Sequence, residues 1–298
     1  MSQFPNTSYQ HLVFTVPEEL RTLILLNRKI LLNALFKLAA DTITSWTIKS
    51  KFYIPGITLV LHTFGRDIKF NPHIHLLLTG GGLSLDYSSW INNSFIPHQP
   101  LKSIWRHKVI SFISNSTKKQ HLILPHSIHD NLNSFLSRLY SKIWYVNLGK
   151  KLSTARFTIT YIGRYTKRPV IAESRILEYD GKFVTFSYED PKSTKTCYVR
   201  LTVEDFIARL IRHIPDKGFR QIRYAGVFAT RVRSKLIPTI NNLLEKIKKS
   251  AHIFIGTLRN FLEVPRCPKC GCEMILIGIF HNGEYVYTDE IYYNNRSP

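Results

Sequence analysis

The chain has 298 residues, of which 44% are hydrophobic and 12% aromatic, a composition that is typical of globular proteins and excludes a mainly disordered chain. At this length it can form one large domain or two smaller ones. Lys and Arg number 41 against 20 Asp and Glu, and the resulting net charge of +21 predicts a polyanionic partner, most commonly nucleic acid.

Neither secretion nor membrane insertion is expected from the sequence. Residues 1–10 lack a basic cluster followed by an apolar run, so they do not predict a signal peptide. The most apolar region, residues 20–40, is interrupted by charged and polar side chains and predicts no membrane span. Without a secretory signal, we expect the four cysteines to be reduced thiols or metal ligands.

The N-terminal region predicts a strand, a helix and a second strand. Residues 9–16 are typical of a short strand, and Pro17 then stands at the first-turn position that proline favours. It opens a long amphipathic helix that is expected to run towards Trp46. The second strand is expected at residues 57–64 and a turn at 65–67, so that this strand and the next form an antiparallel hairpin.

The strand after that turn carries the most informative motif of the chain, His73-Ile74-His75. Residues two apart on a strand point to the same face, so both imidazoles lie on one face of the strand, roughly 6.6 Å apart along it. Neutral imidazoles suit many transition metals, and a pair on one rigid face can hold a divalent cation. The alternative is two partly buried histidines with ordinary hydrogen-bond partners. We interpret the glycine run 80–82 as the turn that ends this strand.

The remaining elements are predicted with less detail. Residues 84–150 are expected to be mostly helical. A hairpin with Asp180-Gly181 as its turn follows, and Thr202 is expected to begin a helix in the manner of a capping box. Another amphipathic helix passes through Ile240, and its basic end at 246–249 is interpreted as a solvated face that adds to the attraction for DNA.

A second chemical constellation lies at residues 161–168, on a short helix that is expected to end at Pro169. Helical positions four apart are neighbours on one face, so Tyr161 and Tyr165 present two phenols together. A phenol has a pKa near 10 and is a poor nucleophile at neutral pH. It can attack phosphorus when the phosphate is polarised by a metal and the phenol is helped to lose its proton.

Three cations accompany the two tyrosines. Arg164 and Arg168 share the same helical spacing with Lys167 beside them, and guanidinium groups can grip phosphates bidentately. The alternative is an ordinary helix with two half-buried tyrosines. Together with the metal-type histidines and the charge of +21, this segment indicates cleavage of a nucleic-acid strand through a phosphotyrosine.

With these motifs the chain resembles the bacterial rolling-circle transposases of the insertion sequence 91 group, which are two-tyrosine members of the HUH (His-hydrophobic-His) endonuclease superfamily. The resemblance covers nearly the whole chain. Its ordered matches are residues 9–20, 61–65, 71–75, 80–82, 161–168, 174–175, 206–210, 213–219 and 223–226.

The resemblance implies an α+β fold with a compact antiparallel sheet, helices on one side of it (an RRM-like palm) and a mainly helical C-terminal part. The histidine pair is expected on a central strand, with the nucleophile helix packed across the sheet. The implied domains are an HUH-type catalytic domain at 1–190, a helical extension at 191–262 and a cysteine-containing knuckle and tail at 263–298.

The resemblance also implies transposition through single-stranded DNA, with Mg²⁺ or Mn²⁺ held by His73 and His75 and with Tyr161 and Tyr165 as nucleophiles. The implied partners are single-stranded DNA at the element's ends and target DNA, in the nucleoid of a bacterial cytoplasm. One tyrosine takes the 5′-phosphate of the first cut, and the second serves the later cleavage. A plasmid replication initiator or relaxase with the same chemistry, or a decayed copy that only binds DNA, remains the alternative.

A third protein ligand is usual in the superfamily, and our candidate is His62. If the hairpin turn is centred between Asp67 and Ile68, residues whose numbers sum to 135 face each other, which places His62 opposite His73. Asp67 or a polar residue near the tyrosine helix is the alternative ligand. The alternative interpretation of His62 is a core histidine.

Two features concern zinc. Cys267 and Cys270 have zinc-ribbon spacing and Cys272 follows, but a tetrahedral structural site needs a fourth ligand, for which His281 is the candidate. We favour a degenerate or turn-forming knuckle, followed by a loosely held tail after His281. Family members also commonly carry a cysteine-rich zinc-binding segment ahead of the part that begins here, so autonomous recognition of the element's ends is in question.

Overall fold

The structure is a computed structural model that describes residues 4–93, 95–152, 163, 169–190, 193–261, 267–272, 278–281 and 284–288. The chain forms two compact units, residues 1–240 and residues 241–298. Among the described residues, no helix has both the length and the apolar character that crossing a bilayer requires.

The N-terminal elements follow the expected order, but the long helix is interrupted. They are β1 (Tyr9–Thr15), a 3-10 turn η1 (Glu18–Leu20), α1 (Arg21–Leu26) and α2 (Arg28–Lys51). The interruption is at Asn27, whose side-chain amide donates to the carbonyl oxygens of Leu23 (2.9 Å) and Ile123 (2.8 Å). Because its Oδ1 also accepts the N–H of Ile123, the Asn27 side chain joins this break to a distant loop.

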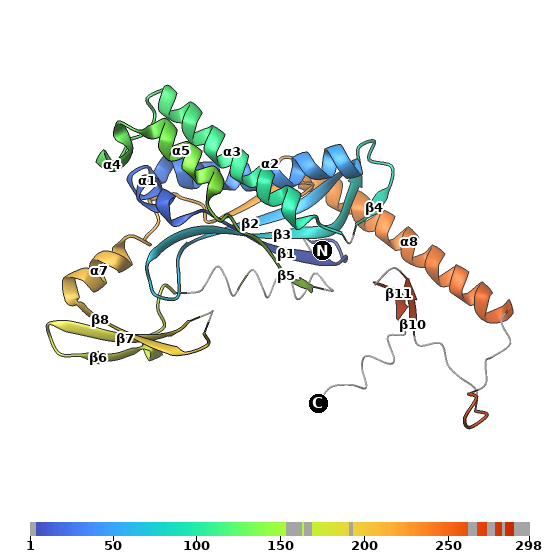
Figure 1. Ribbon diagram of the computed structural model, residues 1–298. Helices are drawn as coiled ribbons and strands as arrows, with labels where there is room; N and C mark the ends of the chain where they lie inside the picture. Colours follow the sequence, from blue (N-terminus) through green and yellow to red (C-terminus); the bar gives the residue numbers. More distant parts are fainter. Residues whose placement is uncertain are drawn as a thin grey trace. The chain divides into compact units, whose positions relative to one another are not determined.

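A six-stranded antiparallel sheet forms the centre of the first unit (Figure 1). Its order is β5-β1-β3-β2-β9, and the short β4 pairs with β3. The bounds are β2 (Tyr53–Phe64), β3 (Phe70–Ser84), β4 (Trp90–Asn92), β5 (Val146–Leu152) and β9 (Ile222–Gly226). The expected β2–β3 hairpin is confirmed, and β3, which carries His73 and His75, lies in the middle of the sheet.

Helices cover one face of this sheet (Figure 1). They are α2, α3 (His98–Lys118) and α5 (Leu132–Ser141), with the short α4 (His126–His129) beside α5. The sheet residues that pack against them alternate along each strand and are fully buried, namely Leu12, Phe14, Leu59, Leu61, Ile74, Leu76 and Leu78. Burial of each such side chain stabilises the fold by about 1.5–3 kcal/mol. Because these residues must face the helices, the residues between them in each strand face the other side of the sheet.

The glycine run does not form the expected turn. Residues 80–82 lie inside β3, which continues to Ser84 and pairs there with β2 and β4. A Cβ atom on Gly82 would lie 2.4 Å from the carbonyl oxygen of Ile54, and one on Gly80 would lie 2.0 Å from Ser8 Oγ. These glycines therefore let neighbouring chain segments approach closely, which is a common role of glycine inside a strand.

A smaller three-stranded sheet follows, made of β6 (Ile176–Tyr179), β7 (Phe183–Glu189) and β8 (Thr196–Thr202). The Asp180-Gly181 turn is confirmed, with Gly181 at a φ of 89°. Thr202 caps α7 (Val203–Ile211) as expected, because its side chain accepts the Asp205 N–H at 3.2 Å.

The small sheet is joined to the central one through the tip of the β2–β3 hairpin. Ile68 at that tip is fully buried and packs in one cluster with Val184, Phe186 and Phe206. After α7 the chain returns to the central sheet as β9. The first unit thus extends beyond residue 190, to residue 240.

Two expectations about local structure differ from the fold. The end of the stretch 84–150, which was expected to be mostly helical, instead belongs to the edge strand β5 (Val146–Leu152). Residues 284–288, expected to belong to a loose tail, form β11, which pairs with β10 (Gly278–His281) in the second unit. Both are short strands whose hydrophobic and polar residues alternate only weakly, so their sequence does not distinguish a strand from a helix or a loop. The expected amphipathic helix is confirmed as α8 (Arg233–Phe261).

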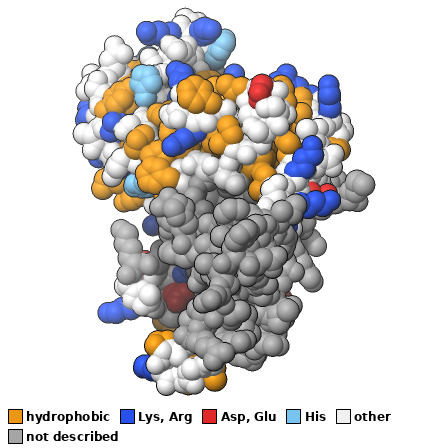
Figure 2. All heavy atoms as spheres, turned by 90° about the vertical axis from the view of Figure 1, so that its right-hand side faces the viewer, with side chains coloured by type: hydrophobic (Ala, Val, Ile, Leu, Met, Phe, Trp, Pro, Cys, Tyr) orange, Lys and Arg blue, Asp and Glu red, His pale blue; other side chains and the backbone are white. Residues whose placement is uncertain are grey.

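Positive charge is spread over the face of the molecule that Figure 2 draws. On the face drawn in Figure 2, Lys and Arg side chains lie among hydrophobic ones, and acidic side chains are sparse. On this face the basic side chains are dispersed, and such a surface suits a polyanionic partner.

Candidate metal centre

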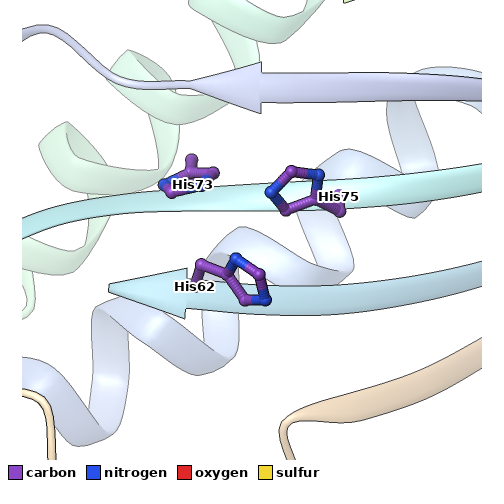
Figure 3. Close-up of side chains that lie close together, drawn as sticks. All are labelled: His62, His73 and His75. Atoms are coloured by element: carbon purple, nitrogen blue, oxygen red, sulfur yellow. The ribbon is translucent and has the colours of Figure 1, made fainter. Parts of the chain in front are cut away.

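Three histidines gather on the sheet face opposite the helices (Figure 3). On β3, Ile74 points into the core, so His73 and His75 on either side of it point the other way and are half-buried. On β2, His62 lies directly opposite His73, as the expected register requires, and is 7% exposed. The ring nitrogens that could act as ligands all lie within 4.8 Å of one another.

This trio is the only such group of His, Cys, Asp or Glu side chains within the part of the chain that the structure describes. The alternative ligand Asp67 is not part of it. Its carboxylate accepts the Lys69 N–H at 3.2 Å and lies 3.6 Å from Lys69 Nζ. Of the ligands expected from sequence, the structure therefore brings together His62, His73 and His75.

Hydrogen bonds orient two of these rings. His73 Nδ1 lies 2.7 Å from the carbonyl oxygen of Asn71, to which it can only donate. A neutral imidazole that donates through Nδ1 carries its lone pair on Nε2, the form in which histidine binds metals.

The ring of His75 is held by His11 of β1. His75 Nδ1 and His11 Nε2 are 3.0 Å apart, and the two rings are parallel to within 6°. Burial lowers the pKa of His11 to about 4, so His11 is neutral at physiological pH and can accept a hydrogen bond. With His11 as acceptor, His75 also donates through Nδ1 and carries its lone pair on Nε2.

Sequence reasoning missed His11, although it lies in the expected first strand. A single histidine in a strand gives no signal of its own. Only the pairing of β1 with β3, which sets Val13 opposite His75, brings it to the site.

The histidines open into a cavity of about 330 Å³. Two arginines that sequence reasoning did not assign to the site, Arg66 and Arg175, also line it. Arg175 Nε donates to the carbonyl oxygen of Ser187 at 2.7 Å, and Arg66 forms an ion pair with Glu189 at 3.0 Å. Both guanidinium groups are thus tied to the small sheet, at a place where they can meet an anion bound beside the histidines.

The predicted nucleophile segment is not placed by the structure. Tyr161, Tyr165, Arg164, Lys167 and Arg168 lie outside the described residues. The next residues in the chain, Pro169 and Val170, line the histidine cavity.

The three cysteines of the predicted knuckle lie in the second unit. Cys267, Cys270 and Cys272 are free thiols in a turn, in which the Cys267 N–H donates to the Cys272 carbonyl oxygen at 2.8 Å. Gly271 takes a φ of 73°, and hydrogen bonds from Lys269 and Cys270 lower the pKa of the Cys267 thiol. The side chain of His281 lies outside the described residues, so a zinc site here stays a prediction.

A family comparison then decides the identity of the chain. The Y2_Tnp family, described as "Putative transposase", matches residues 56–235, a span that includes all three histidines and both predicted nucleophiles. The chain belongs to this transposase family. The resemblance found from the sequence motifs is confirmed.

Two relatives show how far the similarity extends. The transposase for insertion sequence element IS801 of Pseudomonas savastanoi pv. phaseolicola is 34% identical over 284 residues, which is 92% of this chain and 68% of that protein. Putative transposase y4qJ of Sinorhizobium fredii (strain NBRC 101917 / NGR234) is 26% identical over 80% of this chain and 63% of its own length. No solved structure matches this transposase family member.

Proposed function

We propose that the chain nicks and rejoins single-stranded DNA at the ends of its element through a 5′-phosphotyrosine intermediate. The observation that supports this most is the set of three histidines whose ring nitrogens lie within 4.8 Å of one another in an open cavity. We assign the central sheet to the palm of an HUH endonuclease. In this proposal, residues 1–190 form the catalytic domain.

The donor atoms of the site fit a divalent transition metal. His62, His73 and His75 would hold it, and imidazole nitrogens favour Mn²⁺ over Mg²⁺, which prefers oxygen ligands. A cation bound there supplies Lewis-acid polarisation of the scissile phosphate. Arg66 and Arg175, which line the same cavity, would neutralise the adjacent phosphate charge.

The nucleophile comes from the chain segment just before the cavity. Pro169 lines the cavity, and Tyr165 precedes it by four residues, which can span at most about 14 Å. One of Tyr161 and Tyr165 attacks phosphorus, its phenolic oxygen bonds to the 5′-phosphate, and the leaving 3′-oxygen takes up a proton. The broken phosphodiester is conserved as a phosphotyrosine, so rejoining needs no ATP. Arg164, Lys167 and Arg168 would hold flanking phosphates.

The test is covalent capture of DNA. Labelled single-stranded ends of the element are incubated with the protein and Mn²⁺ or Mg²⁺, and the adduct is followed on denaturing gels. We expect an adduct that disappears in the Tyr161→Phe plus Tyr165→Phe double variant and forms faster with Mn²⁺. The matched control is Tyr198→Phe, a tyrosine on β8 that is 69% exposed.

Two outcomes would overturn the assignment. Nicking that persists in the double tyrosine variant would exclude the proposed nucleophiles. DNA binding without any adduct from the unaltered protein, with either metal, would favour an inactive DNA-binding copy. A replication initiator or relaxase would instead cleave an origin sequence in preference to the element's ends.

A further inference from the structure

A second and larger cavity lies at the edge of the central sheet, beside β9. It encloses about 870 Å³, and five cations line it, namely Lys29, Lys217, Arg220, Arg223 and Arg233. They come from α2, from the loop before β9, from β9 itself and from the start of α8. We call this cavity the β9 cleft.

The β9 cleft is electrostatically one-sided. Asp216 is the one carboxylate in its lining. Within the described residues, none of the five cations forms an ion pair with a carboxylate, although ion pairs elsewhere in the chain engage Arg21, Arg66 and Arg200. Several cations that share a concave wall repel one another, and an anion that enters relieves that repulsion.

Arg223 is held in place inside the cleft. Its guanidinium carbon lies 4.3 Å from the ring centre of Phe36 and 5.6 Å from that of Phe219, and it donates to Asn33 Oδ1. Burial and the neighbouring charge of Arg220 lower the pKa of Arg223. A guanidinium held against aromatic rings loses little freedom when it binds a phosphate, which favours binding.

The wall of the cleft is also built by specific bonds. Arg28 of α2 donates to the carbonyl oxygens of Arg212 (2.8 Å) and Ile214 (2.7 Å) and so ties α2 to the chain that leads into the loop. Phe219 in that loop packs against Phe36, with ring centres 6.2 Å apart. The two sides of the cleft are therefore held together without a ligand.

The β9 cleft is separate from the metal centre. Arg223 pairs with Leu59, whose side chain packs on the helix-covered side of the sheet, whereas the three histidines occupy the opposite face. The linings of the two cavities share no residue. The cleft thus cannot be explained as part of the histidine site.

We propose that the β9 cleft binds the sugar-phosphate backbone of single-stranded DNA away from the cleavage site. Its cations suit successive phosphates, and the half-buried Tyr224 in its lining adds an aromatic ring for an unpaired base. The choice of DNA rests on the proposed function, but binding in the cleft requires neither the metal nor the tyrosines. DNA binding in the β9 cleft can therefore be tested independently of strand cleavage.

The test is binding of a labelled single-stranded oligonucleotide to the full chain in EDTA, followed by fluorescence anisotropy over a range of salt concentrations. The test variant is Lys217→Gln plus Arg220→Gln, because both side chains are exposed and their loss leaves the core intact. We expect affinity to fall about tenfold at low salt, and the log–log salt slope to become shallower by about 1.4. The matched control is Lys118→Gln plus Lys119→Gln, two exposed lysines at the end of α3.

Each outcome decides the proposal. Loss confined to the cleft variant supports it, as does the same loss in a His73→Ala background. An equal loss in the control variant would mean that dispersed surface charge holds the DNA, and an unchanged slope would exclude the cleft from binding. Stronger competition by duplex DNA or by RNA of the same sequence would overturn the choice of ligand. Arg223→Gln is a second variant, and its folding is checked by thermal melting.

Discussion

The two faces of the central sheet use histidine in opposite ways. On the helix-covered side, His213 is 5% exposed, and its two ring nitrogens are bonded to Thr63 Oγ1 at 3.1 Å and to the carbonyl oxygen of Ile68 at 2.9 Å. On the other side, ring nitrogens of His62, His73 and His75 converge at the wall of an open cavity. His213 therefore holds chain segments together, whereas the other three are arranged as ligands.

This comparison shows what distinguishes a histidine with a structural role from one arranged as a metal ligand. Burial alone does not, since His62 and His213 are almost equally buried, at 7% and 5% exposed. What differs is the use of the nitrogens: both nitrogens of His213 are bonded to a hydroxyl and a backbone carbonyl, whereas His62, His73 and His75 each bring one nitrogen to within 4.8 Å of the others. The alternation of β3 makes this separation possible, because Ile74 enters the core between two histidines that face away from it.

The largest effect should follow from removing a ligand on the histidine face. His73→Ala should lower the rate of adduct formation by more than about 100-fold, because changes in partners of metal ligands already cost 10–100-fold. Its melting temperature should stay close to that of the unaltered protein, since His73 is half-buried and outside the core. His121→Ala, at an exposed histidine, is the matched control. Full activity of His73→Ala would mean that the cation, if any, binds elsewhere.

The reverse behaviour is expected one residue along the same strand. Ile74→Ala should lower the free energy of unfolding by about 2–5 kcal/mol, because it leaves a cavity under α2 and α3. Chemical denaturation measures this, and binding of Mn²⁺ to the protein that remains folded should be unchanged. If Ile74→Ala lost Mn²⁺ binding but kept its stability, this would contradict the assignment of the core to one face of the sheet and of the metal ligands to the other.

A smaller effect on metal binding is expected for His11. His11→Phe keeps a ring beside His75 but removes the partner that lies 3.0 Å from His75 Nδ1. We expect Mn²⁺ affinity to fall by about tenfold in titration calorimetry, the size of effect typical of residues that orient a ligand. Tyr9→Phe on the same strand, where the hydroxyl donates to the Pro5 carbonyl oxygen, is the control and should bind Mn²⁺ normally.

The histidine hairpin could be predicted from sequence because local rules determine it. The turn at 65–67 fixes which residues of β2 and β3 face each other, and strand alternation then sets His62 beside His73. The glycine run was misinterpreted, since glycine is common both in turns and where backbones approach closely, and only the neighbouring Tyr53, Ile54 and Ser8 distinguish the two.

Features that depend on distant parts of the chain could not be predicted. Arg175 reaches the cavity because the small sheet docks on the hairpin tip through Ile68, and the same docking supplies Glu189 as the partner of Arg66. The β9 cleft forms because a five-residue strand joins the edge of a sheet made mostly by the first 152 residues. Neither strand pairing across such distances nor the meeting of α2 with the loop before β9 leaves a local pattern in the sequence.

The smallest effect concerns pH and tests the structural role of His213. Burial is the main cause that lowers the pKa of His213 below its ordinary value, and the charges of Arg28 and Arg212 lower it further. The folded state therefore resists protonation, while the unfolded chain takes up a proton near pH 6.5. Stability is complete above that pH and is lost as the pH falls from about 6.5 towards the lower folded-state value. The melting temperature of the unaltered protein should thus decrease more steeply between pH 7 and pH 5 than that of His213→Gln. Parallel curves for the two proteins would mean that other groups, such as His11, account for the acid sensitivity and that His213 does not hold the helix-covered face as a neutral imidazole.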